Sequence, residues 1–343
     1  MDWSQSYSAE WRIFRVNRDT WADAEQVMNV DAVNVTRTAD GDLLESGGID
    51  ATGDLRPDYY RIVMTAIQGG EVERVDVATL LFDANGGNVN HAVHTQDMNG
   101  YSVLYPASRT AVIAGEYAPA GIDGARYAGD LLASAINAPV VVEGVFTLND
   151  HIVHEIGSFV LDAVWAVLDA GGFVIQIDGR GVVHIRPKPK DPTLILDSKN
   201  TRLLQNGIDY DADLSEIPNR YVVIVDNNKT IAINDDPNSE VSTVNRGYLV
   251  DEVDESPTPV NGETIGAYAA RRLEEMSVLE TQHTYKREYA PDVYLYDIVR
   301  GSIDGLEGDM RVKSQTVNCG KGVTIQEKAV REEALWQRIS QMN

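Results

Sequence analysis

Short runs in which hydrophobic and polar residues alternate fill the first hundred or so positions. Val75, Val77 and Thr79 alternate with Asp76 and Ala78, the period of two that is typical of a half-buried strand. Turn-forming pairs recur at short intervals along this section, at 69–70, 85–87 and 99–100. Many short strands with regular turns predict a β-sandwich or β-barrel over residues 1–115 and not a parallel α/β sheet.

The hydrophobic pattern changes to a helical one near residue 116. A helix is expected to begin after Asp123, which can cap it, and to end at Asn137 because Pro139 disfavours helical geometry before it. A second helix is expected over 159–170, with Ser158 as a cap and Gly171-Gly172 as its end. Residues 173–185 then read as a hairpin with its turn at 178–181. We therefore expect a small α+β domain over residues 116–190.

Strand patterns return after the proline-rich joint at 186–192. A hairpin at 220–233 is followed by a helix near 263–276 and by strand patterns at 281–285, 293–299, 310–317 and 323–326. This makes 191–327 a second β domain with an inserted helix. A C-terminal helix is predicted for the segment 328–343. Its hydrophobic residues lie on one side of the helical pattern from Lys328 to Met342. The predicted fold is α+β and mostly β, with two barrel- or sandwich-like domains on either side of the α+β domain.

The composition narrows the class of protein. In 343 residues there are 29 Lys and Arg against 53 Asp and Glu, a formal charge of −24, which disfavours sequence-specific or duplex-wrapping binding of nucleic acid. The N-terminus does not have the pattern of a signal peptide, and the apolar stretch 159–168 is too short to span a membrane. The single cysteine, Cys319, can form no internal disulfide. These features favour a soluble, acidic protein of several domains.

Two histidine pairs are the first candidates for a metal site. His91 with His94 and His151 with His154 each have a spacing of three, but neither has the glutamate position of a zinc peptidase. Structural histidines are the favoured interpretation of both pairs. Asp83, Asn85 and Asn88 match a calcium loop poorly, and the acidic run 251–255 is typical of a solvated loop. We therefore predict no metal and no cofactor.

Motifs for catalysis are missing from the sequence. It contains no nucleophile elbow, no P-loop and no dinucleotide-binding glycine pattern before a helix, and Cys319 has no histidine near it in sequence. No catalytic residue is assigned, and a non-enzymatic structural or binding protein is predicted.

The order of the predicted domains resembles the baseplate hub proteins of tailed bacteriophages, which have relatives in contractile injection machines. Four segments carry the resemblance: the hairpin 173–187, the strand Asn219–Val225, the helix Thr264–Leu273, and the late strands around 297–299 and 310–312. Longer family members carry C-terminal extensions, some of them wall-degrading, and no such activity is transferred to this chain.

The resemblance implies a homotrimeric ring at the tail tip of the virion, assembled in the host cytoplasm. Its implied partners are a distal tail protein or tail tube protein, the tape measure protein, and receptor-binding, fibre or spike proteins. Phage DNA would pass through the ring without specific binding, and no membrane span is expected. Two alternatives stay open: a receptor- or glycan-binding tail module, and a metal-dependent hydrolase that uses His151 and His154.

Overall fold

The structure is a computed structural model of the whole chain, and it divides into two compact units. Unit 1 comprises Met1–Ile208 and Thr284–Ala329, and unit 2 comprises Asp209–His283 and Val330–Asn343. The residues described are 7–39, 41–51, 57–90, 93–113, 117–197, 203, 208–225, 228–255, 257, 263–289, 291, 293–303, 306–320 and 323–335.

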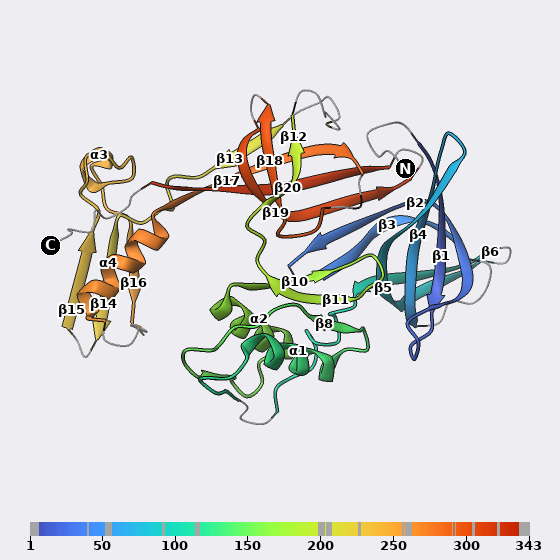
Figure 1. Cartoon of the computed structure of the whole chain (residues 1–343), viewed down its shortest axis with the longest axis horizontal. Helices are drawn as coiled ribbons and strands as arrows, with labels where there is room; N and C mark the ends of the chain where they lie inside the picture. Colours follow the sequence, from blue (N-terminus) through green and yellow to red (C-terminus); the bar gives the residue numbers. More distant parts are fainter. Residues whose placement is uncertain are drawn as a thin grey trace. The chain divides into compact units, whose positions relative to one another are not determined.

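A large, mostly antiparallel sheet forms the β part of unit 1 (Figure 1), in which β12 and β18 are a parallel pair. Its central order is β20-β19-β2-β1-β4-β5-β6, with β3 paired to β2, and with β18 paired to both β19 and β12. The strands are β1 (Ser8–Val16), β2 (Asp23–Thr38), β3 (Gly41–Ala51), β4 (Asp58–Gln68), β5 (Glu71–Asn90), β6 (Val93–Ser102), β12 (Pro192–Leu196), β18 (Ile298–Ile303), β19 (Leu306–Cys319) and β20 (Thr324–Ala334). Because β2 pairs with β19, strands from both β sections of the sequence share one sheet.

Strand β5 is buried on both of its faces. Leu80 and Phe82 pack into one core with Ile13, whereas Leu81 packs into a second core that contains the helices of the α+β section. A register shift in the pairing of β4 with β5, next to Val77, accompanies the change in the burial pattern along the strand. The sheet therefore has an apolar layer on each side.

The α+β section lies within unit 1 and contains two helices against a small sheet (Figure 1). The sheet order is β10-β11-β8, and β7 pairs with β9. The elements are β7 (Tyr117–Ala118), α1 (Gly124–Ala135), β8 (Val140–Val142), β9 (Ile152–Val153), α2 (Val160–Gly171), β10 (Phe173–Ile177) and β11 (Val183–Pro187). Asp123 caps α1 as predicted, accepting hydrogen bonds from the backbone N–H groups of Ala125 and Arg126. The N-cap of α2 is Phe159 and not Ser158, whose hydroxyl donates to the carbonyl of Glu155 instead.

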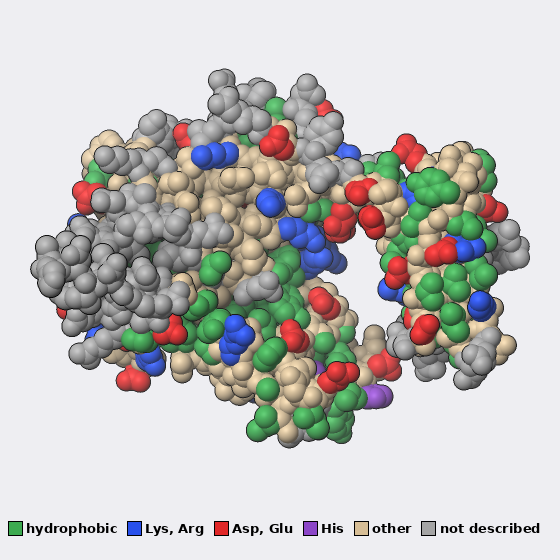
Figure 2. Space-filling model, turned by 180° about the vertical axis from the view of Figure 1, so that it is seen from behind, with side chains coloured by type: hydrophobic (Ala, Val, Ile, Leu, Met, Phe, Trp, Pro, Cys, Tyr) green, Lys and Arg blue, Asp and Glu red, His purple; other side chains and the backbone are tan. Residues whose placement is uncertain are grey.

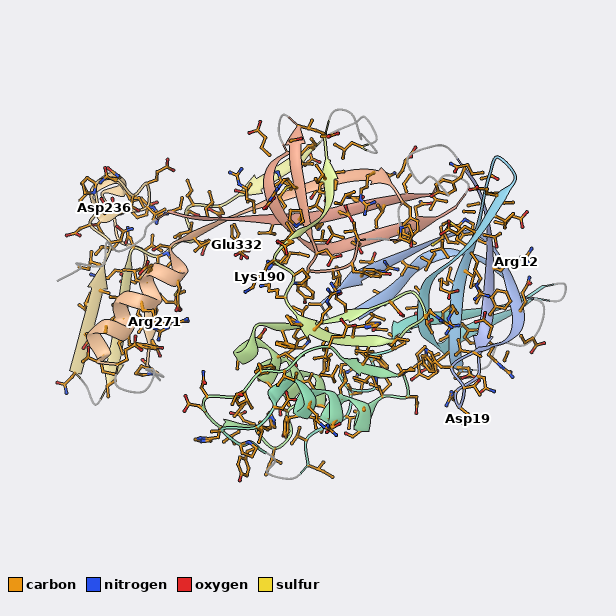
Figure 3. All side chains as sticks on the ribbon, viewed as in Figure 1. Arg12, Asp19, Lys190, Asp236, Arg271 and Glu332 are labelled. Atoms are coloured by element: carbon orange, nitrogen blue, oxygen red, sulfur yellow. The ribbon has the colours of Figure 1, made fainter. Side chains whose placement is uncertain are left out.

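Unit 2 has a three-stranded sheet with one helix across it (Figure 1). The sheet order is β15-β14-β16, and helix α4 packs on the side that carries Tyr221 and Val223. The elements are β13 (Asp209–Ala212), β14 (Arg220–Val225), β15 (Asn228–Ile233), α3 (Thr243–Arg246), β16 (Asp251–Asp254) and α4 (Ile265–Met276), and β17 (Val278–Glu288) begins here and runs on into unit 1. Arg271 projects from α4 (Figure 3) and contacts the carboxylates of Glu263 and Glu275 at 2.9 and 2.8 Å.

The predicted mostly β, α+β fold is confirmed, and the strands of the described residues form open sheets. The predicted helix over 328–343 is wrong for residues 328–334, which belong to strand β20; residues 336–343 lie outside the described part of the chain. In β20, Ile325, Glu327 and Ala329 are all buried at a spacing of two, which is strand periodicity. Neighbouring strands thus decide the conformation of a segment whose local pattern favoured a helix.

Three further local predictions are corrected. The turns expected at 85–87 and 99–100 lie inside the paired strands β5 and β6, where a register shift between Ala84 and Gly86 accommodates the glycines. The strand expected over 293–299 begins only at Ile298, because the backbone turns at Tyr296, which has a φ of 68°.

Candidate functional site

A polar pocket of about 270 Å³ lies in unit 1, against the small sheet of the α+β section. Gln176 and His184 are direct partners in the β10–β11 ladder, and Arg186 lies two residues after His184 on the same face. Val183 and Ile185 point to the opposite face and belong to the helical core. The pocket is lined by Glu143, Gln176, Asp178, His184, Arg186 and Tyr294.

Two sets of hydrogen bonds in the pocket are joined by an ion pair, with Arg186 Nε 3.9 Å from Glu143 Oε2. The His184 ring has Nδ1 2.7 Å from Glu143 Oε1 and Nε2 3.4 Å from Asp178 Oδ2. Arg186 Nη1 donates to Gln176 Oε1 at 3.1 Å, and Gln176 Nε2 donates to Asp297 Oδ1 at 3.2 Å. These contacts hold donors and acceptors in fixed positions before any ligand arrives.

Asp297 is the buried end of this network. Burial raises the pKa of its carboxyl group above the usual value, although the hydrogen bonds from the Tyr294 backbone N–H and from Gln176 act in the opposite direction. The arrangement can bind a polar ligand through both donors and acceptors. Among the described residues that line the pocket beside His184, none is a serine, threonine or cysteine.

The structure does not bring His151 and His154 together. The two residues flank the short strand β9, and side chains three apart in extended chain point to opposite faces. His151 is exposed, whereas His154 is buried and stacks on Tyr127 with 6.0 Å between ring centroids. His91 lies outside the described residues, and only the backbone of His94 is described, in β6. Among the described residues, no group of three or more His, Cys, Asp and Glu side chains could hold a metal ion.

The other candidate residues have structural roles. Asp83, Asn85 and Asn88 lie in strand β5, not in a calcium loop. In the acidic run 251–255, Asp251 pairs with Arg220 at 2.5 Å and Asp254 accepts hydrogen bonds from the hydroxyls of Tyr221 and Tyr268.

Cys319 is fully buried at the end of β19, and burial raises the pKa of its thiol to about 12. A thiol with that pKa is protonated at neutral pH and is a poor nucleophile.

Two exposed apolar surfaces complete the set of candidate sites. The first, the ribbon patch, lies where residues 111–113 and 117–118 run antiparallel to 152–159. The β7–β9 pairing, the Ala111–Phe159 bridge and the hydrogen bonds between Val112 and 157–158 show this arrangement. Its exposed side chains are Ile113, Tyr117, Val153, Ile156 and Phe159.

The second surface, the open face, is the side of the β15-β14-β16 sheet that α4 does not cover. It comprises Val222, Ile224, Ile231, Ile233 and Val253, which the strand registers bring side by side. Figure 2 shows the molecule from behind relative to Figure 1. Hydrophobic side chains gather there over the α+β section and over the side of the unit 2 sheet opposite α4.

The sequence held partial signals for these sites. Polar residues alternate with apolar ones in 173–186, which could have indicated a polar outer face, but Glu143 and Tyr294 join the pocket from distant segments. Ile231 and Ile233 are apolar at the positions that face away from α4. A strand covered on one side usually has polar residues at such positions, so these two isoleucines could have indicated an exposed apolar face.

Comparison with known proteins identifies solved structures with a similar fold. No protein-family model matches the chain, and no curated protein matches it either. The 43 kDa tail protein of prophage MuSo2 from Shewanella oneidensis is 14% identical, covering 94% of this chain and 98% of its own, with a TM-score of 0.61. The tail protein from Neisseria meningitidis MC58 is 13% identical, covering 97% and 98%, with a TM-score of 0.60.

The chain therefore has the fold of these two tail proteins over nearly its whole length. This confirms, at the level of fold, the resemblance that the domain order predicted. No helix in the described residues is long and apolar enough to cross a membrane.

Proposed function

We propose that this protein is a structural component of a phage tail tip, a homotrimeric hub without enzymatic activity. The observation that carries the proposal is the likeness of fold to the tail protein of prophage MuSo2 and to the tail protein from Neisseria meningitidis MC58, over nearly the full length of each chain. The division of the sequence near residues 115 and 190 is part of this proposal, since it separates a β ring section from an α+β section.

In this proposal the hub joins the tail tube or the distal tail protein to receptor-binding, fibre or spike proteins, and it contacts the tape measure protein. The formal charge of −24 supports a DNA conduit, because acidic walls repel the phosphate backbone and prevent it from sticking. Replacement of lumen acids by lysine is then expected to slow DNA ejection from assembled virions. Unchanged ejection kinetics would remove the conduit from the proposal.

Native mass spectrometry of the purified chain tests the subunit number. We expect three copies of the 37.7 kDa chain with no bound metal. Six copies would point to a distal tail protein instead, and one copy with one zinc ion would favour a metalloenzyme. A chain that stays monomeric at all concentrations would overturn the homotrimer.

A receptor- or glycan-binding tail module is the second candidate, and the polar pocket favours it. Its volume of about 270 Å³ is near the lower end of ligand pockets, and Glu143, Asp178 and Arg186 supply acceptors and donors for hydroxyl groups. Calorimetry with a panel of saccharides tests this candidate. Arg186→Ala is expected to abolish saccharide binding, whereas Arg126→Ala, an exposed arginine of α1, leaves it unchanged. If no saccharide binds the wild-type chain, this candidate is excluded.

A further inference from the structure

Carboxylates and bases alternate along the lining of the polar pocket in unit 1. The His184 ring lies between Asp178 and Glu143, and Glu143 in turn lies between His184 and Arg186. With a neutral imidazole, the lining carries two carboxylates against one guanidinium. A cationic ligand would balance this charge.

The two contacts of the His184 ring differ in length. Nδ1 is 2.7 Å from Glu143 Oε1, whereas Nε2 is 3.4 Å from Asp178 Oδ2. A neutral imidazole has one N–H and one lone pair, and N–H to oxygen hydrogen bonds are usually about 2.7–3.2 Å long. We therefore assign the N–H to the shorter contact, which places the lone pair of Nε2 opposite Oδ2. Two acceptors then face each other without a donor between them.

These two acceptor atoms are accessible from the pocket. Asp178 and His184 are both partly exposed and line it, and the other oxygen of Asp178, Oδ1, accepts from the backbone N–H of Val182 at 2.9 Å. A metal ion would need a further ligand, and no group of three His, Cys, Asp and Glu side chains in the described part of the chain could hold one. An ammonium group has three N–H donors and can donate to Oδ2 and Nε2 together.

The arginines near this pair have other carboxylate partners. Arg180, in the same hairpin turn, has its Nε 3.7 Å from Asp76 Oδ2, and Arg186 has its Nε 3.9 Å from Glu143 Oε2. The charge of Asp178 is therefore available to a ligand.

The rest of the pocket matches a sugar. Arg186 uses Nη1 for Gln176, and a guanidinium has five N–H donors, so donors remain for ligand hydroxyl groups. Val141 is the partner of His184 in the pairing of β8 with β11 and is exposed on the same face, where it offers an apolar surface to the C–H groups of a sugar ring. A ligand that carries both an ammonium group and hydroxyl groups would use all of these features.

We propose that this pocket binds an amino sugar, an assignment that rests on the saccharide-binding candidate of the proposed function. The ammonium group donates to Asp178 Oδ2 and His184 Nε2, and the hydroxyl groups bind at Arg186. Hydrogen bonds from a charged donor are roughly twice as strong as neutral ones. The amino sugar is therefore expected to bind about tenfold more tightly than the same sugar with a hydroxyl group in place of the amine.

NMR of the histidine ring signals tests the proposal because it reports binding at His184 itself. The chain is titrated at neutral pH with glucosamine, a cation, and with glucose and N-acetylglucosamine, which are neutral. The His184 signal, assigned by its loss in His184→Gln, is expected to shift with glucosamine at about one tenth of the concentration that either neutral sugar needs. Equal concentrations would overturn the ammonium site and leave the saccharide candidate intact. The absence of a shift with every sugar would overturn both.

Asp178→Asn and its control Asp150→Asn separate this site from the general attraction of a cation to an acidic chain. Both variants remove one carboxylate from a chain with a formal charge of −24, and Asp150 is exposed outside the pocket lining. Asparagine keeps an oxygen for the Val182 N–H and supplies an N–H to Nε2, so the hairpin turn is retained. Asp178→Asn is expected to abolish the tenfold preference for glucosamine, and Asp150→Asn to retain it. The same preference in both variants would overturn the site.

Two other outcomes would also overturn the proposal. A doubly protonated His184 ring in the free chain at neutral pH, read from its ring nitrogen shifts, would mean that both carboxylates already have donors. Binding of N-acetyllysine amide as tight as that of glucosamine would show that the pocket takes a basic side chain of another protein. None of these outcomes affects the homotrimer, which the subunit count tests separately.

Discussion

Arg287 and Glu327 form an ion pair inside unit 1, and neither side chain has any exposed surface. Two parallel hydrogen bonds of 2.7 Å join them, and Gln315 Nε2 donates a third bond of 2.7 Å to the carboxylate. Burial by itself raises the pKa of a carboxyl group, but the Arg287 guanidinium and these donors lower the pKa of Glu327 below its usual value. The pair therefore costs desolvation and is stable only while both partners are present.

Glu327→Gln is expected to reduce the free energy of unfolding by about 3–5 kcal/mol at pH 7, because it leaves a buried guanidinium without its counter-charge. Denaturant unfolding measures the effect. Asp309→Asn, which breaks the exposed pair with Arg300, is the control and should change stability far less. Equal losses in the two variants would show that the buried pair has no special role.

The pH dependence of the same variant has a definite sign. Because the folded pKa of Glu327 is lowered, the stability that its ionisation contributes is fully present above the ordinary glutamate pKa and is lost as the pH falls through the folded value. The difference between wild type and Glu327→Gln should therefore shrink in acid.

Asp297 is expected to behave in the opposite way, since burial raises its folded pKa. A raised carboxyl pKa contributes stability that is present at low pH and is lost as the pH rises through the folded value. Relative to Asp297→Asn, which does not titrate, the wild-type protein should gain stability as the pH falls from neutral toward the ordinary aspartate range. Thermal unfolding at a series of pH values measures this difference, and a difference that is constant with pH would contradict the assignment.

At the scale of elements, the β10–β11 hairpin is held tightly against β5. The Trp21 indole and Arg61 both donate to the carbonyl of Arg180, at 2.8 and 3.1 Å, and Thr79 donates to the carbonyl of Gly179 at 3.1 Å. A Cβ atom at Gly179 would lie 1.6 Å from the carbonyl oxygen of Asp76. The hairpin tip can approach the sheet this closely because glycine has no side chain.

Gly179→Ala is expected to destabilise the protein by about 3 kcal/mol or more, because the backbone of the hairpin or of β5 must move. Gly266→Ala is the matched control: this position lies in helix α4, a Cβ atom there would lie 4.0 Å from Thr230 Cγ2, an ordinary contact, and alanine should stabilise by about 0.5–1 kcal/mol. Denaturant unfolding of both variants measures the contrast. A neutral Gly179→Ala would mean that the hairpin is not pinned to the sheet.

The elements that the sequence predicted well are those whose signals are local. The α1 helix follows from Asp123 and Pro139, and the β10–β11 hairpin from strand patterns on either side of 178–181. The segment 328–334 was mispredicted because its strand conformation depends on pairing with β19 and β17 and not on its own local pattern. The pocket could not be predicted for the same reason: Glu143 meets His184 only after β8 pairs with β11, and Tyr294 comes from a segment more than a hundred residues away.

At the scale of the whole molecule, the formal charge of −24 opposes any association between copies. Three such chains in a ring repel one another over a distance set by the Debye length, which falls from about 30 Å at 0.01 M salt to about 10 Å at 0.1 M. Apolar contacts between copies are not weakened by this screening. Long-range repulsion and short-range attraction thus respond differently to salt.

The proposed homotrimer is therefore expected to become tighter as salt is added. The reason is one of magnitude: screening removes repulsion among all the excess carboxylates of each copy, whereas an exposed ion pair between copies contributes only about 0–1 kcal/mol. Sedimentation equilibrium across a sodium chloride series measures the trend. A trimer that dissociates as salt rises would instead show that ion pairs hold the copies together.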